Sequence, residues 1–256
     1  MNSNNHELRY SVLSERWAVG CSALCCVVLL AVLIPVGTAA GAGLHQSRPP
    51  IMQTGTPAPG GTVVFEDDFT TYSNRWIERE SPKSSVSYRD NALALRVVSP
   101  GVTVWSVPDF AITLDSYTVQ AAATFQAGST DSWFGCVLAY ASEHDFYAFL
   151  VSVEGDWQFV HYLDGEWLDL TPDNAERVTF SDDITGDLRL IQIDVAADVL
   201  SFAVDEQLLG SVVVDDDLHG AGFGVIARAG HGYVEVIFDT VLVSEFAGDM
   251  QRGTSD

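Results

Sequence analysis

One stretch of the chain, residues 132–170, restricts the possible folds more than any other. It holds 10 of the chain's 27 aromatic residues (13 Phe, 8 Tyr and 6 Trp). Polar turn residues divide it into apolar runs, and an Asp164-Gly165 pair separates the last two. Such a pair is a strong hairpin signal because the turn needs positive φ angles, which glycine adopts freely. The pattern predicts a meander of four strands, at residues 133–141, 145–153, 157–163 and 166–170.

The second of these strands is apolar on both faces. Phe146 and Leu150 point to one side of the strand, whereas Tyr147 and Phe149 point to the other. An antiparallel sheet with one face in water usually shows polar residues on that face. We therefore expect both faces of the meander to be covered, or one of them to line a groove.

The rest of residues 62–246 continues as short strands separated by turn residues, without helical periodicity. Further strands are expected at residues 62–65, 85–88, 92–98, 102–105, 117–126, 188–196, 199–204, 208–214, 222–227 and 233–243. So many short strands predict an all-β fold, a two-sheet antiparallel sandwich or jelly roll. Cys136 is the one cysteine of this segment, and we expect it to be a small core residue.

Composition divides the chain into five segments, and the second of them is uncharged and apolar. The segments are a polar tail (1–16), the apolar segment (17–44), a Pro/Gly-rich linker (45–61), the β-domain (62–246) and a polar tail (247–256). The apolar segment is long enough to cross about 30 Å of hydrocarbon as a helix. Arg9 and Arg16 before it favour a cytoplasmic N-terminus. We therefore predict a transmembrane helix that makes the protein a single-pass membrane protein with its β-domain extracytoplasmic.

The alternative for residues 17–44 is a signal peptide. Ala40-Gly41-Ala42 has the small-residue pattern at which signal peptides are cleaved. In that case the mature protein would be secreted, with the same β-domain outside the cell.

The charge of the chain excludes one class of partner. Lys and Arg number 12 against 35 Asp and Glu, a formal net charge of −23. Residues 1–48 hold 3 basic and 2 acidic residues, so 12 − 3 = 9 basic and 35 − 2 = 33 acidic residues remain after them. Nucleic-acid binding depends on neutralising phosphates with Lys and Arg, so we expect no nucleic-acid partner. The same charge favours a soluble, monomeric β-domain.

A series of short motifs resembles the concanavalin A-like jelly rolls of the laminin G-like and 3-keto-disaccharide hydrolase type. In chain order they are FEDDF (65–69) followed by Trp76, YRDNAL (88–93), Phe134-Gly135, Asp145-Phe146-Tyr147, DGEW (164–167), GFGV (222–225) and Phe238-Asp239. The chain departs from the pattern at Asn91, where glycine is usual, and at Asp205-Glu206, where Asn-Gly is usual. Lectins, carbohydrate-binding modules, glycosidases and inert spacers share this fold, so the resemblance implies a fold more than a function.

The resemblance also implies a structural calcium ion between the first and last strands. Its ligands would be Asp67 or Asp68 together with Asp239, because calcium takes carboxylate and carbonyl oxygens on loops. A complete Asp-x-Asp-x-Asp-Gly loop does not occur in the sequence.

The sequence favours binding over catalysis. Retaining glucanases of this fold carry Glu-x-Asp-x-x-Glu on one strand, and that spacing does not occur in the chain. Sugar rings stack on flat aromatic faces beside polar groups that bind the hydroxyls. We expect such a site on the meander, formed by Trp157, Tyr162, Asp164, Glu166 and Trp167.

The leading hypothesis is thus a membrane-tethered carbohydrate-binding or adhesion module with a glycan or protein partner. The alternatives are a structural or assembly domain without a small ligand and, less favoured, a glycoside-processing enzyme.

Overall fold

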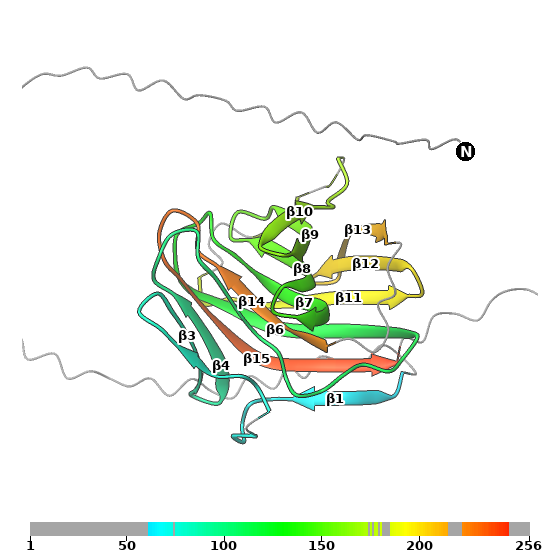
Figure 1. Ribbon diagram of the computed structural model, residues 1–256, viewed down its shortest axis with the longest axis horizontal. Helices are drawn as coiled ribbons and strands as arrows, with labels where there is room; N and C mark the ends of the chain where they lie inside the picture. The colour runs from blue at the N-terminus through cyan, green and yellow to red at the C-terminus, as the bar shows by residue number, and fades with distance from the viewer. Residues whose placement is uncertain are drawn as a thin grey trace, which may run out of the picture. The chain divides into compact units, whose positions relative to one another are not determined.

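The computed structural model describes residues 61–245, except residues 74, 174, 176, 179, 181–184 and 215–221. These residues form two antiparallel β-sheets that pack face to face (Figure 1). The expected membrane helix, nearly all of the linker and the C-terminal tail lie outside the described residues. Within the described part, no helix is long and apolar enough to span a membrane.

The larger sheet has nine strands in the order β13-β12-β11-β6-β15-β4-β3-β2, with β1 paired to β15. Their bounds are β1 Val63–Asp67, β2 Arg79–Glu80, β3 Ser84–Arg89, β4 Ala92–Val97, β6 Ser116–Gly128, β11 Leu188–Ala196, β12 Val199–Val204, β13 Gln207–Val213 and β15 Val234–Glu245. β1 pairs with one half of β15 and β4 with the other half, so both lie along the same side of that long strand. The first and last strands of the domain are therefore neighbours.

The smaller sheet has six strands in the order β10-β9-β8-β7-β14-β5. Their bounds are β5 Thr103–Ser106, β7 Trp133–Ser142, β8 Asp145–Ser152, β9 Trp157–Leu163, β10 Glu166–Asp169 and β14 Gly222–Arg228. Strands β7 to β10 are the predicted meander, with boundaries within two residues of those expected. β14 and then β5 extend the meander on its other side.

The hairpin between β9 and β10 forms as the sequence predicts. Asp164 and Gly165 have φ angles of 50° and 97°, the positive values that a two-residue turn of type I′ requires. Asp205 and Glu206, where the chain departs from the Asn-Gly pattern, also have positive φ angles of 50° and 67°. The β12–β13 hairpin is therefore kept, although two non-glycine residues occupy the left-handed region.

The core lies between the two sheets. Alternate residues of most strands contribute to it, among them Phe149 of β8 and Phe202 of β12, whose rings stack with centroids 4.7 Å apart. Cys136 is completely buried in this core, as expected. The all-β, two-sheet prediction is confirmed. Of the strands in the described residues, the two-residue edge strand β2 is the one that the sequence pattern does not predict.

Candidate ligand-binding face

A second hydrophobic cluster covers the outer face of the smaller sheet, away from the core. Its buried members come from β7, β8, β9 and β14 and the segment after β5, and partly buried aromatic side chains lie over them. We call the aromatic members of this cluster the aromatic face: Trp105, Trp133, Tyr140, Phe146, Tyr162 and Trp167. The two-sided apolar pattern of β8 thus has a physical basis, since Tyr147, Phe149 and Val151 face the core while Phe146, Ala148 and Leu150 face this cluster.

Phe146 is the centre of the aromatic face. Its ring is fully buried beneath its neighbours. The ring centroids of Trp105 and Tyr162 each lie 5.1 Å from that of Phe146, and those of Tyr140 and Trp167 each lie 5.9 Å away. Such spacings are typical of favourable aromatic pairs. Four partly exposed rings are therefore held around one buried ring.

The face gathers rings from strands that are far apart in the sheet. The rings of Trp105 on β5 and Tyr162 on β9 lie 6.2 Å apart, although β8, β7 and β14 separate these two strands. Four strand spacings amount to about 19 Å in a flat sheet. The rings can meet only because the sheet curves toward this face and the side chains lean inward.

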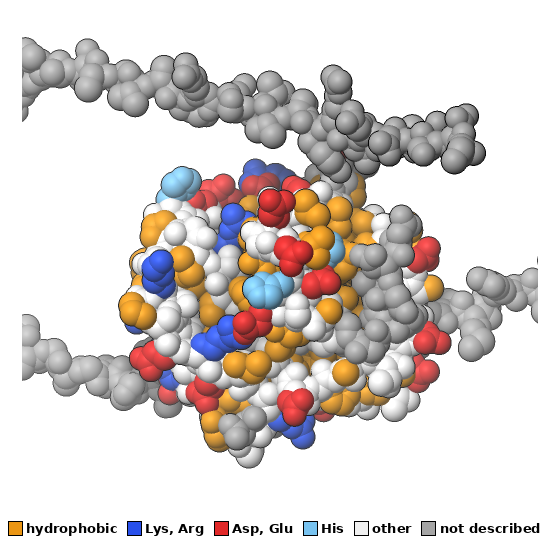
Figure 2. All heavy atoms as spheres, in the orientation of Figure 1, with side chains coloured by type: hydrophobic (Ala, Val, Ile, Leu, Met, Phe, Trp, Pro, Cys, Tyr) orange, Lys and Arg blue, Asp and Glu red, His pale blue; other side chains and the backbone are white. Residues whose placement is uncertain are grey.

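Polar groups border the aromatic face. The guanidinium carbon of Arg79 lies 5.7 Å from the Trp105 ring centre, and that of Arg228 lies 5.9 Å from the Trp167 ring centre. Arg79 also forms an ion pair with Glu143. The indole nitrogen of Trp105 is buried and has no hydrogen-bond partner among the described residues. Figure 2 shows Asp and Glu side chains among hydrophobic ones near β8, β9 and β10.

The structure places three of the five predicted ligand-binding residues near one another. Tyr162 and Trp167 both belong to the aromatic face, with ring centroids 4.7 Å apart. Asp164 lies in the exposed turn between their strands. The exposed side chain of Glu166 precedes Trp167 on β10, so strand alternation directs it to the opposite side of the sheet.

Trp157 is a correction to the predicted site. It is 4% exposed and belongs to the core between the sheets, where its ring lies 5.8 Å from Phe149 and 5.6 Å from Phe202. The backbone register explains its position, because Trp157 pairs with Val151, a core-facing residue of β8. A ring in this position cannot stack on a ligand.

The prediction did not include Trp105 and Arg228 in the site. Trp105 precedes the meander by many residues and reaches it only because β5 pairs with β14, which pairs with β7. Strand alternation was the signal that could have shown that Trp105 points away from its two neighbours. Val104 and Ser106, on either side of it, are buried on the opposite face of β5. Without the strand order, however, alternation does not show which sheet face the ring joins.

The three acids of the expected calcium site do not form one cluster of ligands. Oδ1 of Asp67 accepts a hydrogen bond from the Phe69 N–H, and its Oδ2 accepts from the Ser73 hydroxyl and the Trp76 indole. Oδ2 of Asp239 instead accepts a hydrogen bond of 3.2 Å from Thr124. Among residues 61–245 as far as they are described, no group of three or more His, Cys, Asp or Glu side chains is placed to hold a metal ion.

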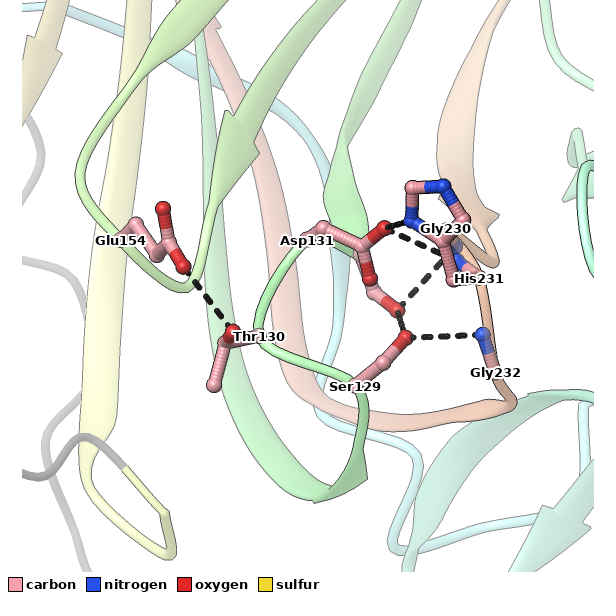
Figure 3. A network of polar contacts seen from close by, with 8 residues as sticks. Ser129, Thr130, Asp131, Glu154, Gly230, His231 and Gly232 are labelled. Atoms are coloured by element: carbon pink, nitrogen blue, oxygen red, sulfur yellow. Dashed lines mark hydrogen bonds and ion pairs between the residues drawn. The ribbon is translucent and has the colours of Figure 1, made fainter. Parts of the chain in front are cut away.

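A polar cluster at one end of the sandwich contains Ser, Asp and His side chains, the residue types of a catalytic triad. Figure 3 shows it between the loop from β6 to β7 and the loop from β14 to β15. Oδ2 of Asp131 accepts a hydrogen bond from the backbone N–H of His231 and is also hydrogen-bonded to the ring Nδ1 of that residue. The hydroxyl of Ser129 accepts a hydrogen bond of 3.3 Å from the N–H of Gly232. Hydrogen bonds from the Ser129 side chain and the His231 N–H hold the pKa of Asp131 below its ordinary value.

The geometry of this cluster does not suit nucleophilic catalysis. The Ser129 hydroxyl pairs with the Ser132 hydroxyl at 2.9 Å, and not with a histidine. The side chain of His231 is 99% exposed, so no pocket surrounds it. A triad needs the histidine between the nucleophile and the acid. We interpret these hydrogen bonds as structural contacts that hold the β6–β7 loop and the β14–β15 loop together.

The two packed antiparallel sheets and their similarity to solved structures show a concanavalin A-like jelly-roll fold, which confirms the expected fold. Three solved structures of similar fold are the carbohydrate-binding module CBM66 from Bacillus subtilis, a beta-glucanase from Bacillus licheniformis and a prokaryotic beta-1,3-1,4-glucanase (lichenase) derived from a mouse hindgut metagenome.

These similarities lie in the fold and not in the sequence. CBM66 is 12% identical, covers 66% of this chain and 95% of its own, and has a TM-score of 0.53. The Bacillus licheniformis glucanase is 13% identical, with 73% and 100% coverage and a TM-score of 0.52. The lichenase is 12% identical, with 72% and 100% coverage and a TM-score of 0.53. No protein-family model and no curated protein matches the chain in sequence.

Proposed function

We propose that this protein is a carbohydrate-binding module that is tethered to the membrane by residues 17–44 and binds a glycan on its aromatic face. The observation that carries the proposal is the group of partly exposed rings around Phe146, on a sheet face that the core does not use. A sugar ring that lies on such rings buries its apolar C–H face, while neighbouring polar groups bind its hydroxyls. The guanidinium groups of Arg79 and Arg228, which lie beside the rings of Trp105 and Trp167, are the polar groups that we expect to bind these hydroxyls.

Binding fits this face better than glycoside hydrolysis does. The outward positions in the middle of β8 hold Phe146, Ala148 and Leu150. A retaining glycosidase needs two carboxyl groups about 5 Å apart on either side of the scissile bond. Apolar side chains at the centre of the sheet supply neither an acid nor a nucleophile.

One observation favours the second candidate, a structural or assembly domain. The rings of the aromatic face pack on one another, and Phe146 has no exposed surface. A face filled in this way can also be a second core that stabilises a curved sheet. The two candidates differ in whether Tyr162 and Trp167 contact a ligand.

The test is binding of the full-length protein to an array of oligosaccharides, followed by calorimetry with a bound sugar. Trp167→Ala and Tyr162→Ala should each weaken binding about 5- to 160-fold, by analogy with the roughly 1–3 kcal/mol measured for base–aromatic stacking. The control is Tyr233→Ala, because Tyr233 is 46% exposed and does not belong to the aromatic face. Absence of binding to any sugar, with the wild-type protein folded, would favour the structural candidate.

A further inference from the structure

We propose that the glycan bound by this protein carries an anionic group, a carboxylate or a sulfate, and that Arg228 binds it. This inference rests on the proposed function and adds the chemical class of the ligand. It follows from the position of one arginine, from its lack of an acidic partner and from the charge of the chain around it.

Arg228 is a residue of the aromatic face by position. It is the last residue of β14, where Val225 and Ala227 face the core while Ile226 belongs to the outer cluster. Alternation therefore directs Arg228 outward. Its guanidinium reaches Trp167 on β10, although β9, β8 and β7 lie between the two strands. The arginine thus leans across the curved sheet toward the ring on which a sugar is expected to stack.

Arg228 has no carboxylate partner in the part of the chain that the structure describes. Four other arginines form ion pairs there: Arg79, Arg89, Arg177 and Arg189. The chain has almost three acidic residues for each basic one. Asp169 shares the outward side of β10 with Trp167, and no ion pair joins it to Arg228 among the described residues. Oδ1 of Asp169 accepts a hydrogen bond of 2.9 Å from the backbone N–H of Thr171.

The chemistry of a guanidinium group placed over an aromatic ring then indicates the ligand. Packing on an aromatic ring uses the flat face of the group and leaves the N–H donors at its edge free. Those donors match the two oxygens of a carboxylate or a sulfate in a bidentate arrangement. The other cation of the face cannot take this role so easily, because Glu143 already neutralises Arg79. Arg228 is therefore the expected anion-binding group.

The net charge of −23 limits how much negative charge the glycan can carry. Repulsion between like charges in water extends over about one Debye length, roughly 8 Å at physiological salt. A densely charged polymer would place many anionic groups near the acids of the protein, with one arginine to offset them. We therefore infer an oligosaccharide with an isolated anionic sugar, such as one uronic acid or one sulfated residue among neutral ones.

The experiment is an array of neutral, uronic-acid-containing, sialylated and sulfated oligosaccharides, probed with the full-length protein. We expect sugars with a single carboxylate or sulfate among the strongest binders. The strongest binder is then compared with its carboxyl-reduced or desulfated form, which should bind about 10- to 100-fold more weakly because a charge-assisted hydrogen bond is lost. The reduced and desulfated pairs also distinguish carboxylate from sulfate recognition.

Arg228→Gln should weaken binding of the anionic sugar by a similar factor and leave its neutral form almost unaffected. The control is Arg96→Gln, which removes the same charge from an exposed position on β4 of the other sheet. Thermal unfolding checks that both variants remain folded. Arg228→Lys, which keeps the charge but loses the planar group, should retain part of the affinity.

The outcomes separate this inference from the function on which it rests. If neutral and anionic sugars bind equally, or if Arg228→Gln weakens both equally, the anionic specificity is wrong while sugar binding stands. If no sugar binds the folded wild-type protein, or if Trp167→Ala leaves sugar binding unchanged, the proposed function fails, and this inference fails with it.

Discussion

The indole nitrogen of Trp76 donates a hydrogen bond of 3.1 Å to Oδ2 of Asp67. Asp67 is 7% exposed, and its carboxylate also accepts hydrogen bonds from the Phe69 N–H and the Ser73 hydroxyl. It therefore joins the end of β1 to the segment that follows, where Phe69 and Trp76 belong to the core. A buried carboxylate is tolerated because donors surround it.

Asp67→Ala should lower the free energy of unfolding by roughly 2–4 kcal/mol, because the Trp76 indole and the Phe69 N–H would be left buried without an acceptor. Asp68→Ala is the matched control. Asp68 is exposed and accepts hydrogen bonds only from Thr70 in the described contacts, so its loss should cost less than about 1 kcal/mol. Chemical denaturation measures both. Equal losses for the two variants would contradict the role given to Asp67.

Calcium binding by Asp67, Asp68 and Asp239 stays a prediction. Calcium that binds only the folded state must raise the melting temperature through mass action. The measurement is thermal unfolding with excess calcium, with magnesium and with chelator. A rise specific to calcium, absent in Asp239→Asn, would support the expected site. The same transition in all three solutions would contradict it and leave Asp67 as an acceptor of hydrogen bonds only.

Trp157→Ala should destabilise the protein much more than Trp167→Ala does. Trp157 is a core residue between Phe149 and Phe202, so its truncation should cost about 3–5 kcal/mol of stability. Trp167 lies at the edge of the smaller sheet, and its truncation should cost no more than about 2 kcal/mol. Urea unfolding of both variants gives the comparison. The assignment of the two rings is wrong if Trp167→Ala is the more destabilised protein.

Burial raises the pKa of the Cys136 thiol to about 12 and that of the Tyr117 phenol to about 12. Both groups are neutral in the folded protein and ionise more easily once unfolded, at pH values near 9 and 10. Their contribution to stability is therefore complete below pH 9 and is lost as the pH rises toward 12. Tyr117→Phe removes one of the two groups and should reduce the loss of stability between pH 10 and 12.

The same burial should make the thiol of Cys136 unreactive. A maleimide reagent at pH 7.5, a value chosen so that about a tenth or less of a free thiol is ionised, should label Cys136 only after denaturant is added. Peptide mass spectrometry separates this label from those on the other three cysteines of the chain. Rapid labelling of Cys136 in the folded protein would contradict its place in the core.

The apolar segment 17–44 should keep the protein in the membrane, with the β-domain outside the cell. Its length and the arginines before it are the basis of this expectation. Membrane fractionation with N-terminal sequencing of the mature protein tests it. A soluble, secreted protein that begins near Gly43 would show that the segment is a cleaved signal peptide.

The strands were predictable because the pattern of this chain is local. The Asp164-Gly165 turn and the alternation around Phe146 depend on residues a few positions apart, and both appear in the structure. The identity of the inner face was not predictable from the meander. Since β8 is apolar on both sides, alternation alone cannot tell whether the set with Phe146 or the set with Phe149 faces the core.

This ambiguity explains the outcome for the predicted site. Trp157 and Trp167 both lie on the meander, but Trp157 pairs with the core-facing Val151, whereas Trp167 pairs with Tyr162 of the outer face. Trp105 could not be assigned to the site at all, because its place depends on a pairing between β5 and β14. Long-range strand order is set by the packing of the whole domain, and the local sequence does not contain it.

The contact between the rings of Trp105 and Tyr162 has a consequence for how the protein folds. Hairpins such as β9–β10 close small loops and form fast, whereas pairing of β5 with β14 must close a loop of more than a hundred residues. A chain that has formed only its meander would carry Tyr162 and Trp167 without the ring from β5. If the aromatic face binds sugar as proposed, sugar affinity would report the completion of folding, and refolding followed by ligand binding should lag behind the early gain of β-structure.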